Sequence, residues 1–288
     1  MKPPCFSYHD PRSVPEVLGL VSTLKNARLL AGGQSLMPML NMRLAAPDHL
    51  VDLNGVAELA YIREEDGALD VGAMTRQRDL EFDERVRARC PLMHEAILHV
   101  GHRQTRNRGT LGGSLCHLDP SAELVTVAAA MDAVATVQSK NGSRDIPFAQ
   151  FPAGLMTPAL RPGELLTSVR FPLWRKGHGH AFVEFARRHG DFAIVSAAAL
   201  LEEDGKGKIT RASLTLGGIA PAPVRARDVE KLLVRASPGS KLFAQAGEAC
   251  RKLEVMEDVH VTAAYRRQLA AVLSRRALEK AHERVARH

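Results

Sequence analysis

The sequence predicts an α+β protein, and two observations favour this fold class. In the C-terminal half, three successive strand patterns are followed by three successive helix patterns. Strands and helices that are grouped in this way, instead of alternating, are typical of α+β domains. A polar stretch with two glycines, residues 174–180, marks where the pattern changes. We therefore expect one domain over residues 1–175 and a second over residues 178–288.

The first half opens with a helix signal. Ser13 followed by Glu16 has the form of a capping box, and Pro15 stands in the first turn, where its missing N–H costs nothing. Apolar residues at helical spacing follow: Val17, Leu18, Val21 and Leu24.

The other elements of this half are apolar runs bounded by turn residues such as Asn54-Gly55 and Asp66-Gly67. Strands are predicted at 27–31, 49–56, 68–74 and 133–138, and the run 164–173 closes this half. Helices are predicted at 91–101 and 121–133, the second with the composition of a buried helix.

The second half supplies the two groups that define the fold class. Strands are predicted at 180–188, 193–203 and 208–220. Helices are predicted at 224–234, 241–253 and 262–285.

The composition is ordinary for a globular protein. Hydrophobic residues make up 45% and charged residues 25% of the 288, enough for more than one core. No apolar run approaches the roughly 20 residues that a membrane-spanning helix needs, and the N-terminus lacks the apolar region of a secretory signal. The four cysteines lie far apart without a CxxC pair, so we expect free thiols and a cytoplasmic protein.

The net charge is +7, and much of the excess lies in the C-terminal helix pattern. A basic surface can bind nucleic acid, but only 5% of residues are aromatic and no recognition motif is present. We therefore expect no nucleic acid, and instead a solvated face or a face that docks an acidic partner subunit.

Two Gly-Gly segments form the first candidate site. "AGGQSL" at 31–36 is echoed by "TLGGSL" at 110–115. Glycines leave backbone N–H groups free to converge on an anion, and the polar side chains beside each pair add donors. The alternative is that each pair is a tight turn that needs glycine for positive φ.

Carboxylates just past the second segment, and an aromatic residue in the C-terminal half, have open interpretations. Asp119 or Ser121 is a candidate N-cap, with Glu123 in the first helical turn. The alternative is that Glu123 accepts a hydrogen bond from a sugar hydroxyl, as acidic residues do in nucleotide sites. Phe192, in a glycine-containing turn, either starts a core strand or stacks on a planar ring.

No standard nucleotide or metal motif is present. The sequence has neither GxGxxG nor GxxxxGK[ST], and Ser35 and Ser114 fail the GxSxG pattern at its last position. His94 and His99 are five residues apart, which rotates them by roughly 140° on a helix and separates them as zinc ligands.

Taken in this order, the segments resemble the FAD-binding medium subunit of molybdenum hydroxylases, the group of aerobic carbon monoxide dehydrogenase and xanthine dehydrogenase. Residues 29–53 and 101–124 are similar to that family's two pyrophosphate-binding segments, and "RRHGDFA", "APAPVRARDVEKLL" and "YRRQLAAVLSRRALEKA" extend the similarity to the C-terminal half. The resemblance implies an FAD-binding domain of the PCMH/VAO type with subdomains at about 1–55 and 56–175. It also implies a C-terminal domain like that of the CO dehydrogenase flavoprotein, a three-stranded antiparallel sheet with three helices.

The resemblance also implies which residues bind FAD. The two glycine segments wrap the diphosphate, Glu123 lies near the ribose, the backbone of Leu166 lies by the cofactor and Phe192 lies against the isoalloxazine. The full set is Leu29, Leu30, Ala31, Gly32, Gly33, Gln34, Ser35, Leu36, Thr110, Leu111, Gly112, Gly113, Ser114, Glu123, Leu166 and Phe192. Val183 stands where some relatives carry a lysine near the flavin, and no catalytic side chain or metal ligand is expected.

The implied activity is electron relay within an oxidoreductase complex. The chain lacks the cysteine spacing of iron–sulfur proteins, so the 2Fe–2S clusters and the molybdenum cofactor are expected on partners. These are a small 2Fe–2S subunit and a large molybdopterin-binding subunit, in a dimer of heterotrimers. Two other functions stay open: a stand-alone FAD-dependent oxidase or dehydrogenase, and a non-catalytic nucleotide-binding module.

Overall fold

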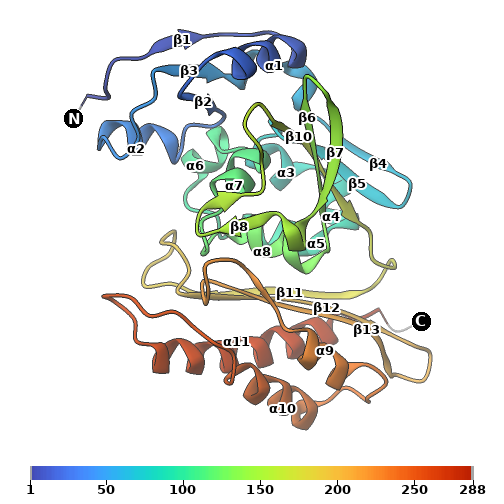
Figure 1. Ribbon diagram of the computed structural model, residues 1–288. Helices are drawn as coiled ribbons and strands as arrows, with labels where there is room; N and C mark the ends of the chain where they lie inside the picture. The colour runs from blue at the N-terminus through green and yellow to red at the C-terminus, as the bar shows by residue number, and fades with distance from the viewer. Residues whose placement is uncertain (1, 287–288) are drawn as a thin grey trace.

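The computed structural model describes residues 2–286, which form three main sheets and one two-stranded ribbon. The sheets follow one another from the N-terminus at the top of Figure 1 to the C-terminal helices at the bottom. The α+β class is confirmed.

The first sheet is small and parallel, in the order β1-β3-β2. Its strands are β1 (Ser7–His9), β2 (Ala27–Leu30) and β3 (His49–Asp52). Parallel neighbours need crossover connections, which α1 (Val14–Thr23) and α2 (Leu36–Asn41) provide. The helix start at Ser13 is confirmed, because Ser13 Oγ accepts the Glu16 N–H at 3.4 Å. In a capping box the Glu16 carboxylate would also accept the Ser13 N–H. It accepts the Arg12 N–H instead, at 2.7 Å.

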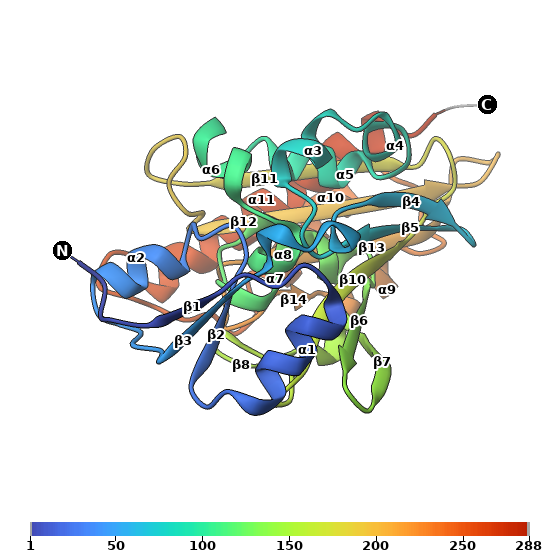
Figure 2. The ribbon, with the colours of Figure 1, turned by 90° about the horizontal axis from the view of Figure 1, so that it is seen from above.

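The second sheet is antiparallel and has five strands in the order β4-β5-β10-β6-β7. Its strands are β4 (Ile62–Glu65), β5 (Ala68–Gly72), β6 (Val134–Ser139), β7 (Gly142–Pro147) and β10 (Leu165–Pro172). Asp66 and Gly67 both have positive φ at the β4–β5 hairpin, as its turn requires. Figure 2 shows α3, α4 and α5 on one side of β4 and β5 and α1 on the other.

Six helices and a few short elements accompany this sheet. The helices are α3 (Gln77–Phe82), α4 (Glu84–Arg89), α5 (Pro91–Ile97), α6 (Arg103–Arg108), α7 (Leu111–His117) and α8 (Glu123–Ala130). The short elements are the 3-10 turns η1 (Leu53–Gly55), η2 (Ala57–Leu59) and η3 (Phe148–Gln150) and the ribbon β8 (Pro152–Gly154) with β9 (Thr157–Pro158).

The third sheet is antiparallel, and the predicted three strands and three helices are confirmed. The strands are β11 (Gly179–Phe185), β12 (Val195–Glu203) and β13 (Ile209–Gly217). The helices are α9 (Arg227–Leu233), α10 (Ser240–Cys250) and α11 (Ala263–Glu283). The structure adds β14 (Val224–Arg225), which pairs with β13. The helix predicted from residue 224 therefore begins three residues later.

The third sheet is buried on both faces. Ala197 and Ala199 of β12 pack toward α9–α11, whereas Ala198 and Leu200 join the core built by α5 and α8 (Figure 1). A strand covered on both faces has a near-continuous apolar sequence, which explains the run from Val195 to Leu201. One apolar core thus extends across residue 175, and the division into domains at that point stays a prediction.

Candidate functional site

The first glycine segment connects β2 to α2 and uses its two glycines differently. Gly33 has φ of +75°, a conformation that glycine adopts at little cost. A Cβ on Gly32 would overlap the carbonyl oxygen of Arg108 and lie 2.8 Å from Gly109 Cα. The turn interpretation thus describes Gly33, whereas Gly32 is required by close backbone approach.

The second glycine segment forms the start of α7. Thr110 is the N-cap, and its Oγ1 accepts the Gly113 N–H at 3.1 Å. A Cβ on Gly112 would lie 2.6 Å from Ala73 Cβ, so this glycine allows α7 to pack against the end of β5. A Cβ on Gly113 would lie 3.3 Å from Ala31 Cβ. The two segments therefore lie against each other, as their proposed common role requires.

Arg76 links the chain around the two glycine segments through hydrogen bonds. Its guanidinium donates to the carbonyl of Arg108 and, at 2.5 Å, to Asn54 Oδ1. Asn54 Nδ2 in turn donates to the Ala31 carbonyl at 3.0 Å. Sequence reasoning missed Arg76 and assigned Asn54 only to a turn, because neither residue belongs to a motif.

The two segments differ in the backbone donors that they offer. In α7, the N–H groups of Leu111, Gly112 and Ser114 donate to backbone carbonyls, and that of Gly113 donates to its cap. Within residues 2–286, the N–H groups of Gly32 to Ser35 have no acceptor in the protein. The anion-binding donors predicted for both segments are thus available mainly in the first, while the second supplies close packing and the hydroxyls of Thr110 and Ser114.

Glu123 lies in the first turn of α8, as predicted, but neither candidate N-cap fills that position. The N-cap is Ala122, without a side-chain cap bond, because Asp119 Oδ1 accepts the Ser121 N–H at 2.9 Å in a local turn. Glu123 is only 6% exposed. Burial, assisted by the negative charge of Glu184, raises the pKa of its carboxyl to about 8. The residue is therefore protonated at neutral pH and is both a hydrogen-bond donor and an acceptor.

A histidine–glutamate pair lies near Glu123. His99 Nδ1 is 3.2 Å from Glu184 Oε1, and this contact raises the pKa of His99. Glu184 Oε2 is buried and has no partner within the described chain. No sequence motif links His99 with Glu184, 85 residues further along the chain, so this pair could not be predicted.

Leu166 and Phe192 occupy contrasting positions. Leu166 is buried on β10, next to a register irregularity. Phe192 is 65% exposed in the β11–β12 loop, so the interpretation that it starts a core strand is wrong. A Cβ on Gly190 in the same loop would lie 2.5 Å from His102, which brings this loop against the start of α6. Val183 packs with the C-terminal helices, whereas its neighbour Glu184 faces His99.

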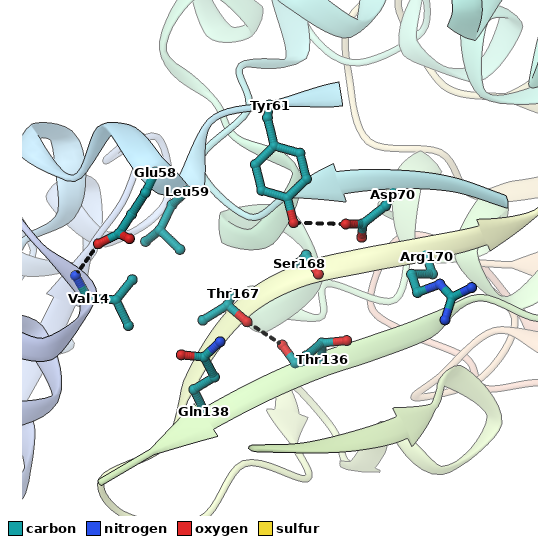
Figure 3. A pocket seen from close by; sticks show the side chains of 10 residues that line it. All are labelled: Val14, Glu58, Leu59, Tyr61, Asp70, Thr136, Gln138, Thr167, Ser168 and Arg170. Atoms are coloured by element: carbon teal, nitrogen blue, oxygen red, sulfur yellow. Dashed lines mark hydrogen bonds between the residues drawn. The ribbon is translucent and has the colours of Figure 1, made fainter. Parts of the chain in front are cut away.

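A separate pocket of about 370 Å³ lies on the polar face of the five-stranded sheet (Figure 3). Its lining includes Tyr61, whose hydroxyl donates to Asp70 Oδ2 at 2.8 Å, together with Ser168 and Arg170. None of the sixteen predicted residues lines it. We therefore assign the candidate site to the glycine segments and not to this pocket.

Comparison with known proteins identifies the family of the chain. Residues 4–174 match the family model of the FAD binding domain in molybdopterin dehydrogenase. Residues 180–281 match the CO dehydrogenase flavoprotein C-terminal domain. The chain belongs to the family of FAD-binding medium subunits of molybdenum hydroxylases.

Several members of this family are similar over nearly their whole length. The 6-hydroxypseudooxynicotine dehydrogenase complex subunit alpha of Paenarthrobacter nicotinovorans is 40% identical, covering 99% of this chain and 97% of its own. The structure of carbon monoxide dehydrogenase from Hydrogenophaga pseudoflava matches with a TM-score of 0.96 at 35% identity, covering 99% and 100%. That of quinoline 2-oxidoreductase from Pseudomonas putida 86 matches with a TM-score of 0.94 at 37% identity, covering 98% and 99%.

These matches confirm three of the predictions: the family, FAD as the cofactor, and a place in an oxidoreductase complex. Among the described residues, no helix combines the length and the apolar composition needed to cross a membrane. The sixteen FAD contacts and the path of the electrons stay predictions.

Proposed function

We propose that this medium subunit relays electrons within a molybdenum hydroxylase complex. When bound, FAD supplies the chemistry that accepts and passes on electrons, and the protein binds and orients it. In this proposal the electrons come from 2Fe–2S clusters on a small subunit and leave to an external acceptor. The substrate is oxidised on the large molybdopterin-binding subunit. The support is the match along 99% of the chain to a subunit of a dehydrogenase complex and to carbon monoxide dehydrogenase medium chains.

Within that role, we assign the FAD diphosphate to the first glycine segment. The unpaired N–H groups of Gly32 to Ser35 are the observation that carries this assignment, since convergent backbone donors bind anions well. Thr110 and Ser114 add hydroxyls beside them. The protonated carboxyl of Glu123 suits a sugar hydroxyl, which needs both a donor and an acceptor.

Two further residues are assigned to other parts of FAD. The backbone of Leu166 is proposed to lie beside FAD, and the exposed ring of Phe192 to stack on the isoalloxazine. We further propose a dimer of heterotrimers in a reducing cytoplasm, which suits the four unpaired cysteines of the described chain.

The diphosphate assignment is tested by placing a negative charge in the first glycine segment. Ser35→Glu is expected to lower the flavin content per chain by about tenfold, because the new carboxylate repels the diphosphate at short range. Ser143→Glu, on an exposed serine of β7, is the matched control and should keep its flavin. Full flavin content in folded Ser35→Glu protein would refute the assignment.

The relay itself is tested on the purified complex. Adding the substrate of the complex should reduce the flavin only when the molybdopterin and 2Fe–2S subunits are present. An isolated chain that turns over a substrate unaided would instead identify a stand-alone flavin enzyme. This outcome would leave the diphosphate assignment intact, so the two tests fail separately.

A further inference from the structure

A cationic pocket of about 240 Å³ lies apart from the candidate flavin site, and none of the sixteen predicted residues lines it. Helix α4 contributes Arg87 and Arg89, the segment before β11 contributes Lys176, and the end of α11 contributes Arg284. No acidic residue lines the pocket. Four cationic side chains in one concave site create a local positive potential that attracts anions.

The carboxylates near these cations neutralise only part of the charge. Arg87, Arg89 and Arg284 pair with glutamates outside the pocket lining, at 2.9 Å, 2.9 Å and 2.8 Å. Lys176 is exposed, and no carboxylate of residues 2–286 lies within ion-pair distance of it. Within residues 2–286, Lys176 therefore offers a positive charge that no carboxylate compensates.

Two buried nitrogens at the same pocket also lack partners. Trp174 is 2% exposed, and its indole N–H has no acceptor within the described chain. The Nδ1 of His180 is likewise buried without a partner there. Leaving a buried polar group unsatisfied costs free energy, and an oxygen-rich ligand would supply the missing acceptor for the indole.

The histidines do not provide the positive charge. Burial lowers the pKa of His178, and burial with the nearby Arg284 charge lowers the pKa of His180 to about 4. Both rings are neutral at pH 7. Attraction of an anion therefore depends on Lys176 and the three arginines.

We propose that this pocket binds a small phosphate-type oxyanion, either inorganic phosphate or a phosphomonoester. Guanidinium groups and an ammonium that converge from three separate segments suit a tetrahedral anion with several acceptor oxygens. The volume is below the roughly 300–1,000 Å³ of pockets for larger ligands, which favours a small anion. This proposal is independent of the flavin relay.

The proposal is tested by titration calorimetry on the full chain together with its co-purifying subunits. Inorganic phosphate is added at constant ionic strength, with chloride as the compensating anion, and saturable binding of one phosphate per chain is expected. Lys176→Glu should weaken this binding by at least about tenfold, the loss expected for one charge-assisted contact. Lys252→Glu, which reverses an exposed charge elsewhere, should bind as the wild type does.

A second variant tests the unpaired indole. Trp174→Phe keeps an aromatic ring but removes the N–H, so phosphate affinity should fall severalfold in the folded variant. If Trp174→Phe does not fold, the comparison of Lys176→Glu with Lys252→Glu, both at exposed positions, still tests the proposed phosphate binding. A parallel titration with glycerol 2-phosphate shows whether the free ion or a monoester binds more tightly.

Three results would overturn the proposal. One is the absence of saturable phosphate binding, and another is an equal loss of binding in Lys176→Glu and Lys252→Glu. The third is release of a co-purifying subunit by Lys176→Glu when phosphate has no effect, because the pocket would then be a contact between subunits.

Discussion

Glu123 shows how one buried carboxyl makes stability depend on pH. Its pKa is about 8 in the folded chain against 4.5 for an unperturbed glutamate. Between these values the folded state holds a proton that the unfolded state has released. The free energy of unfolding of the flavin-free chain should therefore fall as pH rises through this window, by about 1.4 kcal/mol per pH unit from this residue.

Glu123→Gln removes this titration, so the advantage of the wild type over the variant should decrease steadily between pH 5 and about pH 8. Urea unfolding of both proteins at several pH values measures the difference. Glu254→Gln, on an exposed glutamate, controls for the loss of a glutamate as such. A difference between wild type and Glu123→Gln that does not change with pH would contradict the raised pKa.

The glycine pairs mark how far single residues could be predicted. The location of the first pair at the end of a strand could be predicted, since glycine is costly inside such elements, whereas helix α7 at the second pair was not predicted. The different roles of Gly32 and Gly33 could not be predicted, because the close backbone approach at Gly32 involves Arg108, 76 residues away. Whether an N–H is free depends in the same way on distant acceptors such as the carbonyl of Ala73.

At the scale of elements, length decided which ones could be predicted. The long helix α11 and the nine-residue strands β12 and β13 contain enough residues to show a helical period or an extended apolar run. Several elements of three to six residues went unpredicted: β1, β4, β7, α2, α3, α4 and α6. Such short elements owe their conformation to packing and to their neighbours more than to an internal pattern.

Helix α7 is short, and its N-cap is expected to stabilise it measurably. Thr110→Ala removes the hydroxyl that accepts the Gly113 N–H and should lower the free energy of unfolding by about 1 kcal/mol from the lost cap. Thr110→Ser removes the same methyl group but keeps the hydroxyl, so the difference between the two variants isolates the cap. Equal free energies of unfolding for the two variants would show that the bond contributes nothing.

At the scale of the molecule, the two halves are joined by polar contacts as well as by a shared core. Glu95 on α5 accepts the Phe182 N–H of β11 at 3.0 Å and pairs with Lys280 and with Arg284, the latter at 2.8 Å. Burial alone would raise the pKa of Glu95, but these hydrogen bonds lower it below its ordinary value. None of this was predictable from sequence, since the partners lie 87 to 189 residues apart.

Glu95 is therefore expected to restrain the segment between the two halves, where Arg175 and Lys176 are exposed to trypsin. Glu95→Ala leaves two cations and a backbone N–H without their acceptor, and cleavage after Arg175 or Lys176 should accelerate by about tenfold. This rate change corresponds to about 1.4 kcal/mol in local opening when reclosing is faster than cleavage. Because the lowered pKa of Glu95 makes its contribution largest above the ordinary glutamate range, the rate difference from wild type should shrink as pH falls.

Glu164→Ala is the matched control for this cleavage. It breaks a comparable ion pair with Arg144, 2.8 Å long, but within the first half. Cleavage at residues 175 and 176 should then stay at the wild-type rate at each pH. If both variants accelerate cleavage equally, the effect reflects a general loss of stability, and Glu95 has no specific role in holding α5 to β11 and α11.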